Sequence, residues 1–192
     1  MRYPESVEPS LDSGIPYPIT IIALRSRLKP GLDWFAHPSI DYGKWLAFLF
    51  ELGNRVATAA GGQLVGFARE RLQIGLPPPV DGVGVAVELR AALEAARSER
   101  FDSIQYGLAV HQDTVLMVGD PARPGEPLAV GPAMAIADRV ADSNFKHRTT
   151  LLVSSALFGN APGPEFEAVD GLPVPGTSEL LATYAFAGDR NG

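Results

Sequence analysis

The sequence contains no cysteine, which excludes disulfide bonds and thiolate chemistry. It has only three histidines in 192 residues, His37, His111 and His147, and their wide separation does not match the spacing of metal ligands. A protein without disulfides fits a reducing compartment, and we expect a cytoplasmic location.

The chain also lacks long apolar segments and an excess of positive charge. No stretch approaches the ~20 apolar residues of a membrane helix, and residues 1–14 have no apolar core of a secretion signal. The net charge of −6 argues against general nucleic-acid binding. With 46% hydrophobic and 20% charged residues, the composition is that of one folded domain.

Hydrophobic periodicity predicts helices that alternate with strands. The helical pattern occurs at about 41–60, 82–99 and 131–142. Strands are expected at 17–24 and 149–155, near the C-terminus, and in two hairpins at 63–76 and 105–118. The second hairpin is expected to turn at Gln112 and Asp113, and segments 26–39 and 119–128 are expected to be loops.

This order predicts an α+β fold in which helices pack on a central, mainly antiparallel sheet. We expect an irregular arm over 1–16, one domain over 17–187 and a short tail over 188–192.

Five segments occur in an order and spacing that resemble the catalytic domain of class III nucleotidyl (adenylate and guanylate) cyclases. The segments are GGQLVGFARERLQIGLP (61–77), YGLAVHQD (106–113), PLAVGPAMAIADRVADSN (127–144), LLVSSALF (151–158) and LPVPGTSELLATYAF (172–186). The resemblance spans about residues 17–186. It depends on the order and spacing of the five segments together and not on any single motif. It implies a nucleotidyl-cyclase-like (ferredoxin-like, palm-type) fold and a site formed between two subunits.

The resemblance also implies where the chemistry of such cyclases would lie. They hold two divalent metal ions on two aspartates, and the metals assist deprotonation of the ribose 3′-OH and neutralise the triphosphate. The first aspartate falls at Arg25. The second aspartate falls at Glu70, and the glycine that precedes it in the family falls at Arg69. The two purine-reading positions fall at Gly66 and Leu128.

Two further positions of the resemblance lie in the segment 127–144. The family's asparagine, which supports the transition state, falls at Ala135, whereas its arginine is matched by Arg139. Only one of the family's functional side chains is therefore present, and we expect binding of Mg²⁺ or Mn²⁺ to be lost and no cofactor to be used.

The substituted metal position suggests an internal ion pair. A guanidinium ~4 Å from a divalent ion is repelled by several kcal/mol, so Arg25 is expected to pair with Glu70 in place of the metal. Arg69 or Arg71 is an alternative partner for Glu70, and a shift of the alignment by two would put Arg27 in the same role. An ordinary solvated turn is the other reading.

A second candidate site consists of four basic residues, Arg25, Arg27, Lys29 and Arg139. A guanidinium group can bind two phosphate oxygens at once through two parallel hydrogen bonds, so these residues could hold a nucleotide without metal. A solvated basic surface is the alternative.

The remaining residues of interest give weaker indications. Ser154 and Ser155 have no Gly-x-Ser-x-Gly context and no evident His or Asp partner, which argues against a hydrolase. His111 is interpreted as a structural histidine. Trp34 and Phe35 either close over the core or anchor a partner.

Taken as a sequence, the chain is expected to be a degenerate cyclase homology domain without catalytic activity. It would act as a signalling, regulatory or assembly module, as a homodimer or with a cyclase-like partner. Two alternatives remain. The chain could be active only in a heterodimer whose partner supplies the metal aspartates, or it could be a metal-independent nucleotide receptor.

Overall fold

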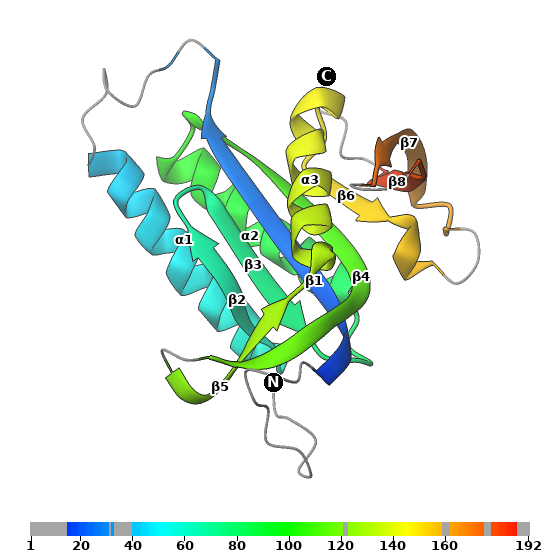
Figure 1. The fold of residues 1–192 in the computed structure, drawn as a ribbon. Helices are drawn as coiled ribbons and strands as arrows, with labels where there is room; N and C mark the ends of the chain where they lie inside the picture. Colours follow the sequence, from blue (N-terminus) through cyan, green and yellow to red (C-terminus); the bar gives the residue numbers. More distant parts are fainter. Residues whose placement is uncertain are drawn as a thin grey trace.

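Eight strands form one twisted sheet in the computed structural model, which describes residues 15–30, 32, 40–120, 123–158, 162–174 and 178–187 (Figure 1). The strands are β1 (Ile15–Leu28), β2 (Gln63–Ala68), β3 (Arg71–Leu76), β4 (Ile104–Asp120), β5 (Arg123–Val130), β6 (Leu151–Ser154), β7 (Phe166–Pro173) and β8 (Leu180–Phe186). The helices in these ranges are α1 (Ile40–Ala59), α2 (Gly82–Arg100), α3 (Pro132–His147) and the short 3₁₀ helix η1 (Ser155–Leu157).

The strand order is β2-β3-β1-β4-β6-β8-β7, and β5 adds to β4 as a hairpin. All pairs are antiparallel except β4 with β6. β1 and β4 form the centre, in continuous register from Ile15 opposite Met117 to Leu28 opposite Ile104. The predicted α+β class with a mainly antiparallel central sheet is confirmed.

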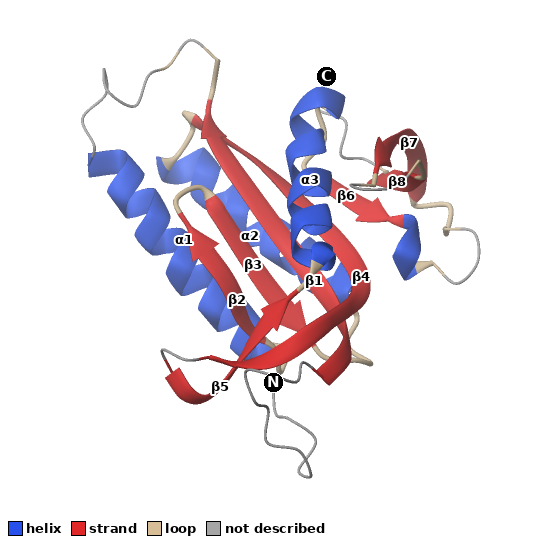
Figure 2. Cartoon of the chain, viewed as in Figure 1, coloured by secondary structure: helices blue, strands red, loops and turns tan. Residues whose placement is uncertain are grey.

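Helices cover both faces of the sheet (Figure 2). α1 and α2 pack on one face, where Ile22 and Leu24 of β1 join their apolar side chains. α3 packs on the other face, against Ile19, Ile21 and Ala23. Because the middle of β1 is buried on both sides, residues 19–24 are apolar except for Thr20, as is typical of a central strand.

The ends of the helices follow recognised local signals. Asp81 caps α2 by accepting hydrogen bonds from the backbone N–H groups of Val83 and Gly84, at 3.0 and 3.1 Å. α3 begins with Pro132, which needs no intrahelical donor at that position. The helix ends at His147, and the next residue, Arg148, has a left-handed backbone with φ 56° and ψ 40°.

The predicted hairpin at 105–118 and the predicted loop at 119–128 are wrong. Residues 104–120 form one continuous strand, β4, and most of the loop is the next strand, β5. Gln112 and Asp113 lie opposite Thr20 and Ile19 of β1. Because β4 pairs with β1 along this whole length, the strand continues through these two residues. Neither Gln112 nor Asp113 is a glycine that would favour a tight turn.

The other predicted elements are confirmed, with shifts at their ends. α3 continues five residues beyond the predicted end at 142, to His147. β1 extends to Leu28, so the start of the loop predicted at 26–39 is strand. Most of that loop, with Trp34, Phe35 and His37, lies outside the described residues, and the boundaries of the domain remain predictions. No helix in the described ranges is long and apolar enough to cross a membrane.

Candidate functional site

Two arginines stand side by side where β1 and β3 approach the turn between β2 and β3. Arg25 of β1 is the register partner of Arg71 of β3. Side chains alternate along a strand, so Arg25 points to the same face as Ile21 and Ala23, which is the face covered by α3. Like charges directly opposite each other destabilise a sheet, and this pair therefore requires nearby carboxylates.

α3 supplies these carboxylates from two residues one helical turn apart. Arg25 Nε donates to Asp142 Oδ1 at 2.8 Å, and Arg71 Nη1 lies 3.3 Å from Asp138 Oδ2. The spacing of four residues puts Asp138 and Asp142 on one side of the helix. The four side chains, which we call the arginine–aspartate cluster, balance two positive charges with two negative ones.

A glutamine completes the cluster. Gln73 Nε2 donates to Asp138 Oδ1 and to the Met134 carbonyl, both at 3.0 Å. The Asp138 side chain is only 14% exposed. Burial raises the pKa of Asp138, and the charges of Arg71 and Arg25 and the Gln73 hydrogen bond oppose that rise. The cluster is therefore a partly desolvated ionic contact between sheet and helix.

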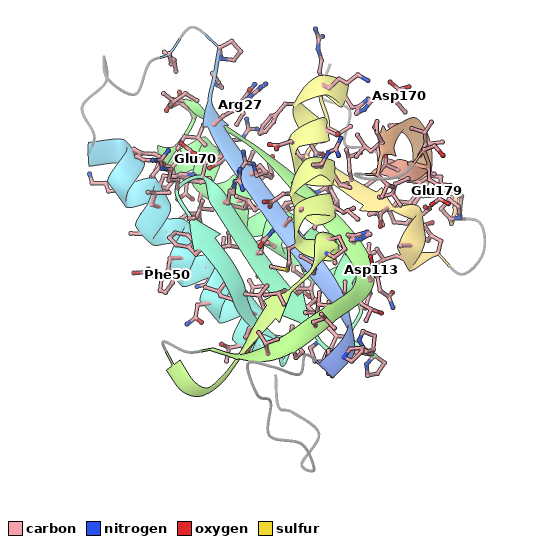
Figure 3. All side chains as sticks on the ribbon, in the orientation of Figure 1. Arg27, Phe50, Glu70, Asp113, Asp170 and Glu179 are labelled. Carbon is pink, nitrogen blue, oxygen red and sulfur yellow. The ribbon has the colours of Figure 1, made fainter. Side chains whose placement is uncertain are left out.

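The expected pair between Arg25 and Glu70 is wrong. Glu70 Oε1 instead accepts a hydrogen bond from the Tyr42 hydroxyl of α1 at 3.1 Å, and Figure 3 shows Glu70 at the β2–β3 turn on the side of α1. Burial and the Glu70 carboxylate raise the pKa of Tyr42 to about 12, so the phenol remains a donor at neutral pH. Arg71, an alternative partner for Glu70, is committed to Asp138. The cross-strand register explains both outcomes, because Arg25 faces Arg71 and not Glu70.

Comparison with solved structures identifies the architecture. A bacterial light-regulated adenylyl cyclase superposes with a TM-score of 0.73 at 12% identity, over 97% of this chain and 56% of that chain. A guanylyl cyclase gives 0.62 at 20% identity, over 92% and 94%. An adenylate/guanylate cyclase/hydrolase from Silicibacter pomeroyi gives 0.65 at 14% identity, over 91% and 100%. This chain has the fold of a class III nucleotidyl cyclase catalytic domain.

The cyclase fold is recognised from the structure and not from close sequence relatives. No protein-family model matches the sequence, and no curated protein matches it significantly. The chain spans little more than half of the light-regulated adenylyl cyclase it resembles.

In the cyclase fold two divalent ions would be expected at the positions of Arg25 and Glu70, and the residues present do not fit them. The Arg25 guanidinium itself supplies the positive charge beside Asp142. No group of three or more His, Asp or Glu side chains suited to a metal ion occurs among the described residues. A metal in this cluster would have to displace two guanidinium groups from their carboxylates.

The assignment of Gly66 and Leu128 to base-reading positions remains a prediction, and the structure shows their surroundings. Gly66 lies in β2 opposite Gln73, and a Cβ atom at this glycine would lie 2.5 Å from Gln73 Oε1. A lysine here would displace the glutamine that supports Asp138. Leu128 lies in β5 opposite Val118, and its side chain is outside the described part of the chain.

The four basic residues proposed as a phosphate site have different surroundings in the structure. Arg25 is held by Asp142. Arg27 lines a pocket at the end of β1, whereas Arg139, exposed on α3, borders a separate apolar crevice with Leu172 and Leu181. Lys29 is exposed. Ala135 is likewise exposed, on the N-terminal half of α3.

The structure gives Ser154 the histidine partner that the sequence did not reveal. His111 Nδ1 lies 2.9 Å from Ser154 Oγ, and His111 Nε2 lies 3.8 Å from Asp113 Oδ2. This arrangement of Ser154, His111 and Asp113 resembles a hydrolase triad, but Ser154 is fully buried and His111 is 3% exposed. No substrate can reach the hydroxyl, so the arrangement is structural, and these residues do not form a hydrolase site.

Proposed function

We propose that this chain is a catalytically silent cyclase homology domain that acts as a signalling, regulatory or assembly module. The observation that carries the proposal is the contact of 2.8 Å between Arg25 and Asp142. At the position of the first metal aspartate, a fixed guanidinium occupies the place of a metal ligand. Two-metal catalysis depends on bound cations to stabilise the attacking and leaving oxygens, and this chain keeps a carboxylate at only one of the two positions.

The fate of Glu70 supports the same conclusion. Its carboxylate is the remaining acidic side chain at an expected metal position, and it accepts a hydrogen bond from the Tyr42 hydroxyl. Arg69, beside it, has a left-handed backbone with φ 52° in a place where glycine is preferred. A positive side chain is thus kept at this turn although the backbone conformation disfavours it.

We expect the purified chain to form no cyclic nucleotide from ATP or GTP with Mg²⁺ or Mn²⁺. The physical reason is the loss of cation-based charge stabilisation, which contributes several kcal/mol to such transition states. The measurement is cyclic AMP and cyclic GMP by mass spectrometry after long incubation, with an active cyclase assayed in parallel as the positive control.

Product formed by the chain alone would contradict the proposal. Product formed only after mixing with a metal-binding cyclase domain would instead favour the heterodimer alternative. That alternative draws support from the exposed side chain of Arg139 on α3, which could reach a partner's substrate. In that case Arg139→Ala would abolish the activity of the mixture.

The β4–β5 hairpin offers a surface for the proposed assembly. Leu116 and Val130 are register partners on it and are 45% and 37% exposed. Figure 1 shows this hairpin extending beyond the helices at one end of the sheet. Leu116 and Val130 pair at the base of this hairpin, near the start of α3, and adjacent exposed apolar side chains suit contact with a second copy or with a cyclase-like partner.

We expect Leu116→Glu to shift the chain from dimer to monomer in multi-angle light scattering at micromolar concentration. Burial of a carboxylate in an apolar contact is unfavourable, whereas the exposed site in the monomer tolerates it. Leu180→Glu, at a residue of β8 that is 68% exposed, is the matched control and is expected to leave the dimer intact. An unchanged dimer in Leu116→Glu would rule out this surface.

A further inference from the structure

A surface pocket of about 420 Å³ lies at the end of the sheet where β1 finishes and β4 begins. It is bounded by the last turns of α2 and α3 and by the link from α3 to β6. Figure 3 shows Arg27 at this end of β1, beside the C-terminal half of α3. Its volume falls in the range of about 300–1,000 Å³ typical of small-molecule sites. The pocket is separate from the arginine–aspartate cluster, since none of its lining residues belongs to that cluster.

The pocket carries an excess of positive charge in a chain whose net charge is negative. Three arginines line it, Arg27, Arg97 and Arg148, together with one acid, Glu94. Arg97 donates to Glu94 Oε2 through Nε at 3.1 Å and through Nη2 at 2.8 Å. Tyr106 donates to Glu94 Oε1 at 2.6 Å. The acid is therefore neutralised by Arg97, and among the described residues that line the pocket two guanidinium charges remain.

Arg27 is held in place by neutral groups. Its Nε donates to Gln105 Oε1 at 3.2 Å, and its Cζ lies 4.0 Å from the centre of the Phe145 ring. Stacking on one face and a hydrogen bond at Nε fix the plane of the guanidinium without cancelling its charge. The Nη groups can then meet two oxygens of an anion in the paired geometry that arginine favours.

Arg148 occupies a backbone conformation that disfavours any residue with a side chain. Its φ of 56° is left-handed, where glycine is the usual residue after a helix. The turn is fixed by buried Asn144, whose side-chain oxygen Oδ1 accepts a hydrogen bond from the Thr149 hydroxyl at 2.8 Å. Asn144 Nδ2 in turn donates to the Leu108 carbonyl at 2.8 Å. Arginine here is strained relative to glycine, and the structure shows no ion pair for it among the described residues.

Attraction to helix ends alone does not account for this charge. α2 and α3 both end at the pocket, and arginines near a helix C-terminus are stabilised by the helix dipole. That effect applies to Arg97 and Arg148. It does not apply to Arg27, which projects from a strand, and it does not offset a left-handed backbone at Arg148.

We propose that this pocket binds a phosphomonoester the size of a nucleoside monophosphate, without a metal ion. A phosphate dianion matches the two uncompensated guanidinium groups of Arg27 and Arg148. The rest of the ester occupies the space beside Tyr106 and Phe145. The inference does not rest on catalytic silence, because the pocket shares no residue with the two metal positions.

The test is thermal unfolding in EDTA with three probes: AMP, inorganic phosphate and adenosine. AMP and phosphate are expected to raise the Tm, AMP more strongly, and the rise is expected to shrink with added salt because the contacts are ionic. Adenosine, which lacks the phosphate, is expected to give no rise. No rise with AMP, an equal rise with adenosine, or a rise with phosphate alone would overturn the proposal.

Two variants assign the binding to these arginines. Arg27→Gln and Arg148→Gly are each expected to weaken AMP binding at least tenfold in calorimetry. Arg148→Gly is also expected to raise the Tm of the unliganded chain, since glycine suits the left-handed backbone, so its loss of binding cannot be ascribed to unfolding. Arg100→Gln removes an exposed arginine at the end of α2 that does not line the pocket, and it is expected to bind AMP normally. Unchanged affinity in both pocket variants would overturn the proposal.

Discussion

Arg25→Asp is expected to lower the free energy of unfolding by about 2–3 kcal/mol and to make stability depend on Mn²⁺. The change removes the partner of Asp142 and places three carboxylates, at 25, 138 and 142, around Arg71 alone. Breaking a buried ion pair costs about 3–5 kcal/mol. The smaller loss of about 2–3 kcal/mol is expected here because solvent partly screens this pair: the Asp142 side chain is 48% exposed and that of Arg25 is 19% exposed. Urea unfolding with and without millimolar Mn²⁺ measures both effects.

Two controls separate charge from packing. Arg25→Gln removes the cation without adding an acid, and we expect about half the loss of stability and no response to Mn²⁺. Arg100→Asp makes the same charge reversal at a side chain that is 71% exposed, where a change within about 0.5 kcal/mol is expected. If the wild-type chain itself gains stability from Mn²⁺, or if Arg25→Asp is as stable as wild type, the guanidinium has not replaced a metal.

The sequence was sufficient for the fold because its signals are local and repeated. Three amphipathic helices and a central apolar strand are visible as periodicity, and Gly61 and Gly62 mark the end of α1. The misplaced turn in β4 shows the limit of such signals. A polar Gln112–Asp113 pair indicates a turn locally, but pairing with a 14-residue neighbour overrides it.

The site could be predicted only in part, because it depends on register between distant strands. The substitution at Arg25 was visible in the sequence, whereas its partner was not. A shift of one residue in the β1–β3 register would exchange the faces, and nothing local distinguishes the two registers. Asp138 and Asp142 did carry a usable signal, namely two acids four residues apart beside the buried Ala137 and Ala141.

The phosphate pocket was out of reach for a different reason. Arg27, Arg97 and Arg148 come from three segments separated by 50 residues or more, and each is an unremarkable charged residue in its own segment. Only the left-handed backbone at Arg148 singles it out, and that property is a feature of the fold. The sequence therefore pointed to Arg27 but grouped it with Arg25, Lys29 and Arg139, none of which lines this pocket.

The buried His111 should make the domain sensitive to mild acid. Burial lowers the pKa of this histidine, and the nearby Asp113 carboxylate opposes the effect only in part. Nε2 is buried and has no hydrogen-bond partner in the part of the chain that the structure describes. The 3.8 Å separation from Asp113 is too long for a hydrogen bond. The folded state therefore favours the neutral ring.

The sign of the pH effect follows from this lowered pKa. Below about pH 6.5 the unfolded chain binds a proton at His111 that the folded chain does not, so stability is complete above this pH and falls as acid is added. The loss approaches about 1.4 kcal/mol per pH unit until the lower pKa of the folded state is reached. Asp138 acts in the opposite direction, because its pKa is raised in the folded state: as acid is added, its effect begins at that raised pKa and is complete near the ordinary value of 3.8. The residue is present in wild type and in a His111 variant alike, so a comparison of the two cancels its effect.

Urea unfolding of the wild-type chain is therefore expected to show stability falling steadily from pH 7 to pH 5. His111→Gln removes the titrating group. We expect this variant to be less stable than wild type at pH 7, because the Ser154 contact changes, yet to have a nearly flat profile over the same range. The slope, and not the absolute stability, is the diagnostic quantity. Equal slopes in the two proteins would mean that another group controls the acid response, because a merely structural defect at position 111 would lower both ends of the curve alike.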